Sequence, residues 1–250
     1  MNVIIPMAGE SKIFKEASLA YSKNFVEINH KPLFQRVFEG VSELEADSFI
    51  FIVNNEDAQK FHIGKSLKLL VPNCRVVVSE GTTAGAACSV LLAAEFIDND
   101  SELVISNGDQ ILEMDLQGVI ENFRAKNFDG GIVTFESVHP RWSFVRLDEH
   151  GLVVETSEKD PISKNATAGF YYFKHGADFV AAAKAMIMKD ASVNGQYYVC
   201  PAYNELILRQ KIIGCYKIPV RNYYPLTTPK EIAEYETHLK RVEKSRRELS

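Results

Sequence analysis

The sequence predicts an α/β protein with a mostly parallel central sheet that is covered by helices on both faces. In the first half of the chain, short apolar runs alternate with helical patterns, which is typical of parallel βαβ units. The runs are continuous rather than alternating, as expected for strands buried on both faces. After residue 129, strand patterns follow one another directly. We therefore expect one domain, residues 1–250, in which a smaller mixed β region follows the parallel part.

The elements of the parallel part come first. Strands are expected at residues 3–7, 49–53, 75–79 and 103–106. Apolar residues spaced three and four apart predict helices from Pro32 to about residue 44, at 58–70 and at 84–96.

The second part has a different order of elements. Strands are expected at residues 130–138, 143–148, 152–157, 168–173 and 211–220, and helices at 177–189 and 198–208. A last helix begins at Thr228 as the cap, with Pro229 first and Glu231 third. We therefore divide the domain into 1–128, 129–227 and a C-terminal helix at 228–250.

The composition excludes several classes of function. The chain has a net charge of −5 and a pI near 5.7, so the basic surplus of a duplex-binding protein is missing and no nucleic-acid partner is expected. Cysteines 74, 88, 200 and 215 lack the two-residue spacing of zinc or redox sites, and four are too few for a disulfide scaffold. No window reaches about 18 apolar residues, and the N-terminus has no signal-peptide pattern. We expect a soluble cytoplasmic protein that binds no membrane.

Ligands of open parallel sheets bind beyond the carboxyl ends of the strands, and three such ends are chemically suited to this. The loop from Met7 to Lys12, with Lys15 and Lys23 beyond it, combines small residues with lysines. Its backbone N–H groups could surround a phosphate, whose charge the lysines would balance. It matches neither a dinucleotide fingerprint nor a P-loop, so a solvated surface loop is the alternative.

The other two loops follow the third and fourth strands. The loop from Glu80 to Ala86 is small and mostly neutral, so a flat base could lie on its backbone; close packing around Gly81 and Gly85 is the alternative. Asp109 follows directly after a buried strand and could bind Mg²⁺, which often takes one or two carboxylates together with substrate phosphates. A turn or cap aspartate is the alternative.

Several short motifs occur in a specific order along nearly the whole chain. They are Ile4-Ile5-Pro6-Met7-Ala8-Gly9, Tyr21-Ser22-Lys23-Asn24-Phe25, Lys31-Pro32-Leu33-Phe34, Thr83-Ala84-Gly85-Ala86, Asn107-Gly108-Asp109, Glu158-Lys159, Asn165-Ala166-Thr167-Ala168-Gly169-Phe170-Tyr171 and Leu226-Thr227-Thr228-Pro229. Their order resembles that of the sugar-phosphate nucleotidyltransferases, which activate small phosphates with a nucleoside triphosphate. The resemblance implies their glycosyltransferase-A-like fold, a three-layer α/β/α sandwich.

The resemblance also implies roles for individual residues. Lys12, Lys23 and Asp109 would be catalytic, with Lys23 near the α-phosphate and Asp109 holding Mg²⁺. Nucleotide contacts are implied for Met7, Ala8, Gly9, Glu10, Ser11, Lys12, Glu80, Thr82, Thr83, Ala84, Gly85, Asn107 and Gly108. Acceptor contacts are implied for Trp142, Glu158, Lys159, Asn165, Gly169 and Tyr197. Trp142 and the Tyr197-Tyr198 segment could line the acceptor pocket, with core packing as the alternative for either.

Three positions depart from the family pattern. Lys12 stands where the family usually has arginine, and lysine cannot make a bidentate contact to a phosphate. Ser22 replaces a proline, and Pro225 occupies the place of a second metal-binding aspartate. The second metal ligand is therefore unassigned.

The resemblance implies transfer of a nucleotidyl group with release of pyrophosphate and without a covalent intermediate. We expect a cytidylyltransferase that passes CMP from CTP to phosphoglutamine or a sugar 1-phosphate, in bacterial capsule or phosphoramidate synthesis. A non-catalytic nucleotide or sugar sensor is one alternative. A glycosyltransferase is another, although residues 107–109 lack an Asp-x-Asp motif. The stripe of Ile232, Tyr235, Leu239 and Val242 could form a homodimer contact.

Overall fold

The computed structural model of the protein describes residues 1–9 and 22–248. In these ranges a central sheet has the strand order β10-β9-β11-β6-β1-β4-β5, and β8 pairs with β11 and with β12. The strands of this sheet are β1 Asn2–Pro6, β4 Ser48–Asn54, β5 Arg75–Ser79, β6 Leu103–Ser106, β8 Gly130–Glu136, β9 Ser143–Leu147, β10 Val153–Glu158, β11 Asn165–Phe173 and β12 Ile213–Lys217. Strands β6, β1, β4 and β5 run parallel to one another, as the sequence predicts.

Strand β1 shows why the first apolar run is continuous. Val3 and Ile5 belong to the hydrophobic core on one face of the sheet, whereas Ile4 belongs to the core on the other face. All three side chains are fully buried. Because β1 has a strand on each side and helices over each face, none of these three central positions faces water.

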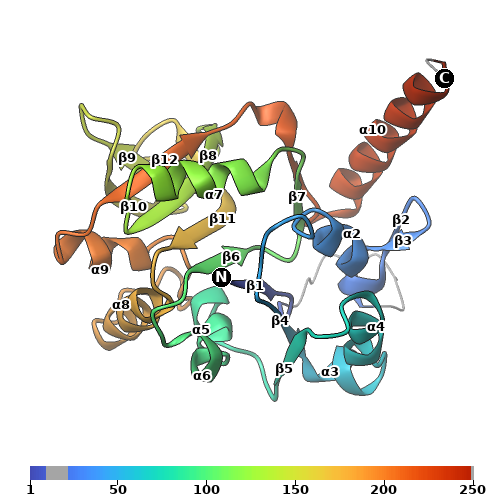
Figure 1. The fold of residues 1–250 in the computed structure, drawn as a ribbon, viewed down its shortest axis with the longest axis horizontal. Helices are drawn as coiled ribbons and strands as arrows, with labels where there is room; N and C mark the ends of the chain where they lie inside the picture. Colours follow the sequence, from blue (N-terminus) through green and yellow to red (C-terminus); the bar gives the residue numbers. More distant parts are fainter. Residues whose placement is uncertain (10–21, 249–250) are drawn as a thin grey trace.

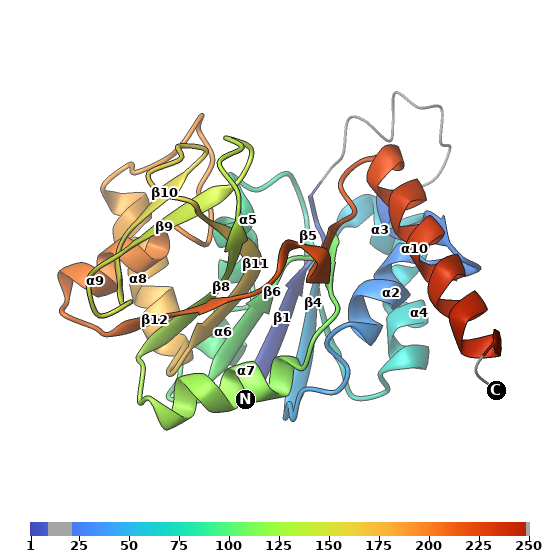
Figure 2. The same ribbon diagram turned by 90° about the horizontal axis from the view of Figure 1, so that it is seen from above.

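Helices cover both faces of the sheet and complete the predicted three layers (Figures 1 and 2). One face is covered by α2 Leu33–Glu39, α4 Ile63–Leu70 and α7 Leu116–Ala125. The other face is covered by α5 Ala86–Leu91, α6 Ala94–Ile97, α8 Gly176–Met188 and α9 Ala202–Leu208. The remaining helical segments are η1 Lys23–Phe25, α3 Asn55–Gln59, η2 Val220–Asn222 and α10 Pro229–Glu248.

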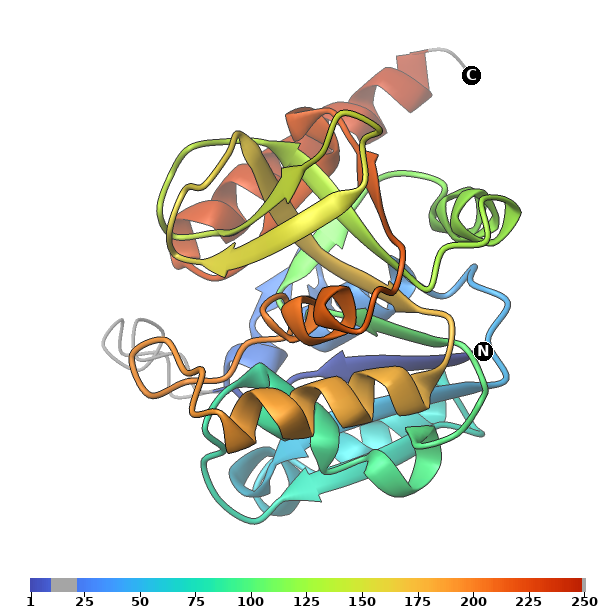
Figure 3. The ribbon, with the colours of Figure 1, turned by 90° about the vertical axis from the view of Figure 1, so that its left-hand side faces the viewer.

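The mixed region begins at β8, as expected from the change of pattern after residue 129. Strand β11 runs antiparallel to β6 and β8 and joins this region to the parallel strands. In Figure 3 the green and yellow strands of the mixed region lie above the blue strands of the parallel part. Two short antiparallel ribbons complete the β structure, β2 Glu27–Ile28 with β3 Lys31–Pro32, and β7 Gln110–Leu112 with β13 Tyr223–Pro225.

The C-terminal helix α10 has the predicted start. Thr228 accepts a hydrogen bond from the Glu231 amide at 3.2 Å, and Glu231 accepts one from the Thr228 amide at 3.0 Å, which is a capping box. Ile232 and Tyr235 are buried in the core of the body, and Leu239 packs against it. Three of the four residues of the apolar stripe therefore pack within the chain, while the far end of the helix, which carries Val242, extends beyond the body (Figure 1).

No helix in the described ranges is both long enough and apolar enough to cross a membrane.

Several expected helices are shorter in the structure than the apolar spacing predicts. His62, with a φ of 52°, separates α3 from α4 within the expected helix at 58–70. The helix expected at 84–96 is divided into α5 and α6, and α9 begins only after Pro201. No element is expected from the sequence at 111–128, where the structure has most of β7 and all of α7. Apolar spacing marks which residues are buried, but turns can bury them as well as helices.

Tyr203 joins the helix layer to two strands and provides a test of the core. Its hydroxyl lies 3.1 Å from the carbonyl oxygen of Gly131 and 2.8 Å from that of Tyr172. Tyr203→Phe removes this buried donor, so the free energy of unfolding should fall by about 1–2 kcal/mol in urea titrations. Tyr216→Phe is the control, since no hydrogen bond of its hydroxyl is seen within the described chain. Equal stability of the two variants would contradict a stabilising role for the hydrogen bonds of the Tyr203 hydroxyl.

Candidate functional site

Asp109 lies in the turn between β6 and β7, and backbone contacts hold this turn from three sides. The Asn107 amide donates to the Gly169 carbonyl at 2.9 Å, and the Leu226 amide donates to the Asp109 carbonyl at 2.8 Å. A Cβ atom on Gly108 would lie 2.5 Å from the carbonyl oxygen of Pro6. The carboxylate of Asp109 is therefore presented from a fixed backbone at the end of β6.

Lys23 reaches Asp109 from η1, a segment 86 residues away along the chain. Asn24 is buried, and its side-chain amide donates to the Met7 carbonyl at 3.0 Å and to Asp57 Oδ2 at 2.7 Å. Ser22 caps η1 by accepting from the Asn24 amide, which is a local use for the residue that replaces the family proline. These contacts place Lys23 Nζ 2.7 Å from Asp109 Oδ2.

The loop after β5 packs against the connection between α8 and α9. The Tyr197 amide donates to the Ala84 carbonyl at 2.7 Å, and the Ala87 amide donates to the Tyr197 carbonyl at 3.0 Å. Gly85 has a φ of 110°, and a Cβ atom there would lie 2.4 Å from the Tyr197 oxygen. The glycine is therefore needed both for its backbone conformation and for this contact.

These loops enclose a cavity of about 530 Å³. Of the residues expected to contact a nucleotide, its lining includes Ala8, Gly9, Thr82, Thr83, Gly85, Asn107, Gly108 and also Asp109. Pro6, Ala86, Ser89, Gln196 and Tyr198 complete the lining. Three further expected residues, Met7, Glu80 and Ala84, are close to lining residues in the sequence but do not line the cavity themselves. Glu10, Ser11, Lys12 and Lys15 fall outside the described residues.

A second cavity, of about 270 Å³, adjoins the first and shares Ala86, Asn107, Asp109 and Tyr198 with it. Of the residues expected to contact an acceptor, it is lined by Trp142, Glu158, Lys159 and Gly169. Arg141, Ser143, Thr167, Tyr171, Val199, Tyr223 and Thr227 complete the lining.

Two expected acceptor residues lie outside this second cavity. The Tyr197 hydroxyl donates to Asp190 at 2.8 Å, whereas its neighbour Tyr198 lines both cavities. Asn165 is the first residue of β11 and is paired with Glu136 of β8, so it is held at the far end of the strand from Gly169.

The second cavity contains two basic side chains and one buried acid. Lys159 Nζ donates to the Tyr198 hydroxyl at 2.7 Å, and the Arg141 guanidinium stacks 3.9 Å from the centre of the Trp142 ring. Burial raises the pKa of the Glu158 carboxyl, which a hydrogen bond from Ser143 and the charge of Lys159 offset only in part. The surroundings of Glu158 therefore favour its protonated, neutral form more than water does.

Arg141 also ties this cavity to the start of α10. Its guanidinium donates to Glu231 Oε1 at 2.7 Å, and Glu231 Oε2 accepts from the amide and hydroxyl of Thr227 at 3.0 and 2.6 Å. Burial raises the pKa of Glu231, but these hydrogen bonds and the charge of Arg141 outweigh it and lower the pKa overall. Sequence reasoning missed Arg141; its only signal was its place directly before Trp142, an expected acceptor residue.

The position of Pro225 is also resolved. It pairs with Gln110 in the β7–β13 ribbon, so the residue that replaces the family aspartate does lie beside Asp109 but supplies no carboxylate. No cluster of three or more His, Cys, Asp or Glu side chains suited to a metal occurs within residues 1–9 and 22–248. Within the described residues, Asp109 therefore suits Mg²⁺ when phosphates or water supply most of the other ligands.

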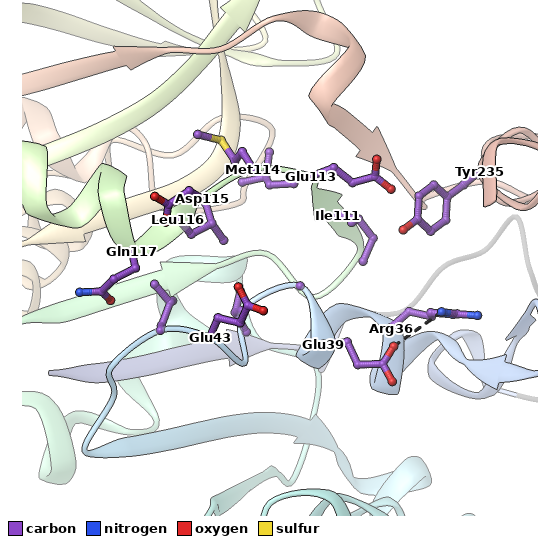
Figure 4. A pocket seen from close by; sticks show the side chains of 14 residues that line it. Arg36, Glu39, Glu43, Ile111, Glu113, Met114, Asp115, Leu116, Gln117 and Tyr235 are labelled. Carbon is purple, nitrogen blue, oxygen red and sulfur yellow. Dashed lines mark ion pairs between the residues drawn. The ribbon is translucent and has the colours of Figure 1, made fainter. Parts of the chain in front are cut away.

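A further cavity of about 450 Å³ lies between α2, the β7–α7 connection and α10 (Figure 4). Its charged lining consists of Glu39, Glu43, Glu113, Asp115 and one cation, Arg36. The Arg36 guanidinium already donates to the carbonyls of Ile28 and Asn29. This acidic cavity is unsuited to a polyphosphate, so the two adjoining cavities at Asp109 form the candidate site.

The comparisons with known proteins agree with this geometry. The family model described as nucleotidyl transferase matches residues 3–210. A nucleoside-diphosphate-sugar pyrophosphorylase from Vibrio cholerae RC9 is 25% identical, covers 94% of this chain and 99% of its own, and has a TM-score of 0.80. A UDP-glucose pyrophosphorylase complexed with UDP-glucose has a TM-score of 0.77 at 15% identity, over 96% of this chain and 98% of its own.

The comparison with curated protein sequences finds no match. Because the family model spans most of the chain and the fold agrees over nearly all of it, the protein belongs to the nucleotidyl transferase family.

Proposed function

We propose that this protein transfers the nucleotidyl group of a nucleoside triphosphate to a phosphorylated small molecule and releases pyrophosphate. The observation that carries this proposal is the pair of adjoining cavities, which share Asp109 with its carboxylate 2.7 Å from Lys23. Two substrates in these cavities would meet at that ion pair. Family membership supports the same reaction class.

In this proposal the chain is one domain with two substrate-binding parts. Residues 1–128 provide most of the larger cavity, which would bind the nucleotide. Residues 129–227 provide most of the smaller cavity, which would bind the acceptor. The C-terminal part, residues 228–250, contains α10 and supports the acceptor part through the pair of Glu231 with Arg141.

The reaction requires positioning and charge neutralisation rather than a protein nucleophile. An acceptor phosphate oxygen attacks the α-phosphorus while the bond from that phosphorus to the bridging oxygen breaks, and pyrophosphate leaves. Lys23 would turn from Asp109 to the α-phosphate and offset its charge. Lys12, which follows β1 in the sequence, would do the same for the other phosphates.

Asp109 would hold Mg²⁺ together with substrate phosphates. The fit rests on its position in both cavities and on the oxygen ligands that Mg²⁺ prefers. When bound, the ion would neutralise phosphate charge and help to align the reacting groups. Pro225 adds no oxygen ligand from its side chain, so we expect affinity for the ion to depend strongly on the bound nucleotide.

The smaller cavity favours a compact anionic acceptor. Arg141 and Lys159 offer charge to a phosphate, and Glu158 in its neutral form could donate a hydrogen bond to a polar group of the acceptor. A sugar 1-phosphate and phosphoglutamine both fit this description. The proposed donor is CTP and the proposed setting is capsule synthesis, as the family resemblance implies. The relatives of known structure have names that refer to nucleotide sugars, which supports a sugar phosphate.

A pyrophosphate-release assay tests the proposal directly. The protein is incubated with Mg²⁺, each of the four nucleoside triphosphates, and a panel of sugar 1-phosphates and phosphoglutamine. Release that requires both substrates supports the transferase. Nucleotide binding without pyrophosphate release from any pair of substrates would instead favour a sensor. That alternative is motivated by Pro225, which stands where the family has a second metal-binding carboxylate.

Loss of the ion pair between Lys23 and Asp109 should slow turnover strongly. We expect Asp109→Asn and Lys23→Met each to lower kcat/KM by about 10²–10³-fold, because each removes charge that acts on the reacting phosphates. Lys60→Met is the matched control and should retain full activity, since Lys60 is exposed at the end of α3, pairs with Glu56 and lines neither cavity. Near-normal turnover in both site variants, measured by pyrophosphate release, would refute the assignment.

Glu158 should make the folded state less stable as the pH rises. Its pKa is raised by folding, so the folded state binds its proton more tightly than the unfolded state does. Stability therefore falls as the pH rises from the ordinary carboxyl pKa through the raised value. We expect the Tm of Glu158→Gln to rise relative to that of the wild type as the pH increases above the ordinary carboxyl pKa. Glu136→Gln, at an exposed pair with Lys217, should leave this pH dependence unchanged, and parallel curves for wild type and Glu158→Gln would contradict the argument.

A further inference from the structure

The connection between α8 and α9 contains a tight turn that leads directly into the nucleotide cavity. The Val193 amide donates to the Gln196 carbonyl at 2.9 Å, and the Gln196 amide donates to the Val193 carbonyl at 3.1 Å. Asn194 and Gly195 between them have φ values of 53° and 70°, as in the two-residue hairpin turns that favour Asn-Gly. In Figure 3 this connection is the orange loop that projects past the end of α8.

The exit of this turn is fixed against the loop after β5. Tyr197, the next residue, exchanges backbone hydrogen bonds with Ala84 and Ala87 at 2.7 and 3.0 Å. The missing Cβ of Gly85 makes room for this contact. Gln196 is therefore held beside Thr83 and lines the cavity together with it.

The position of Gln196 within the cavity distinguishes it from the other polar residues there. Asn107, Asp109 and Tyr198 line both cavities and so lie where the reacting groups would meet. Gln196 lines the nucleotide cavity but not the acceptor cavity, as do Thr82 and Thr83. Ala8 and Gly9 also line only the larger cavity, but they belong to the segment proposed to contact the phosphates. The base of a bound nucleotide would therefore lie beside Thr82, Thr83 and Gln196.

The side chain of Gln196 is also chemically available. Its carboxamide makes no hydrogen bond to another residue of the described chain. The hydroxyl of Thr83 is already engaged, since it lies 2.6 Å from Ser89 Oγ. A carboxamide carries a donor and an acceptor side by side, which is the pattern that recognises a nucleobase edge.

We propose that Gln196 recognises the edge of the nucleobase and sets which nucleoside triphosphate the protein prefers. This inference rests on the proposed function, because it places the base of the donor nucleotide in the larger cavity. It assigns base choice to the α8–α9 turn, in addition to the backbone of the loop after β5.

Equilibrium binding of ATP, GTP, CTP and UTP, measured by calorimetry without an acceptor, tests this assignment. The wild type should prefer one or two of the four. Gln196→Leu removes both the donor and the acceptor, so its affinity for a preferred nucleotide should fall about five- to tenfold. Affinities for the others should change by less than about twofold, because they do not depend on this contact.

Gln196→Glu separates the two halves of the carboxamide. A carboxylate only accepts hydrogen bonds, so it keeps a partner for the amino group of cytosine but opposes the carbonyl of uracil. The ratio of UTP to CTP dissociation constants should therefore rise. Gln59→Leu and Gln59→Glu are the matched controls, since Gln59 is exposed at the end of α3 and lines neither cavity; they should leave all four affinities unchanged.

Equal binding of all four nucleotides by the wild type, or an equal loss for all four in the Gln196 variants, would overturn the inference. Because the measurement needs no turnover, it is separable from the proposed function. A base preference that depends on Gln196 in a protein that releases no pyrophosphate would support the inference and refute the transferase. Failure to bind any of the four nucleotides would refute both.

Discussion

The candidate site depends on how closely the backbone approaches around the turn at Asp109. A Cβ atom on Gly108 would lie 2.5 Å from the Pro6 carbonyl, and one on Gly169 would lie 2.3 Å from Gln110 Oε1. Gly108 lets the turn after β6 approach the end of β1, and Gly169 lets the middle of β11 approach the same turn. Because Asp109 follows Gly108 directly, its carboxylate is placed where the two cavities adjoin. A shift of this turn would move a wall of both cavities.

Contacts from distant parts of the chain then surround this turn. Lys23 reaches the carboxylate from the N-terminal part, and Leu226 holds the backbone of Asp109 from the C-terminal part. Lys23 and Asp109 are both partly removed from water, so each would be costly without the other. The same pairing keeps the ammonium group ready for a phosphate. Stability in the free protein and charge neutralisation in the proposed reaction are therefore served by one interaction.

The sequence predicted the parallel strands best, because a strand buried on both faces must be apolar throughout. The strands at 75–79 and 103–106 match β5 and β6 at both ends. Helix lengths were predicted less well, since His62 interrupts one helical pattern with a left-handed residue. The apolar residues of α7 have helical spacing, and Asp115 caps the helix by accepting from the Gly118 amide. That element was within reach of the sequence and was missed.

By itself, the sequence determined the fold class, the polar loops at the ends of three strands and the family resemblance, because these depend on local pattern and on residue types in order. Tertiary structure decided which side chains share a cavity. It placed Tyr198 rather than Tyr197 in both cavities, set Asn165 outside them and brought Arg141 and Gln196 into them. Such choices depend on strand register, turn conformation and contacts between residues far apart in the chain. No local pattern of residues encodes them.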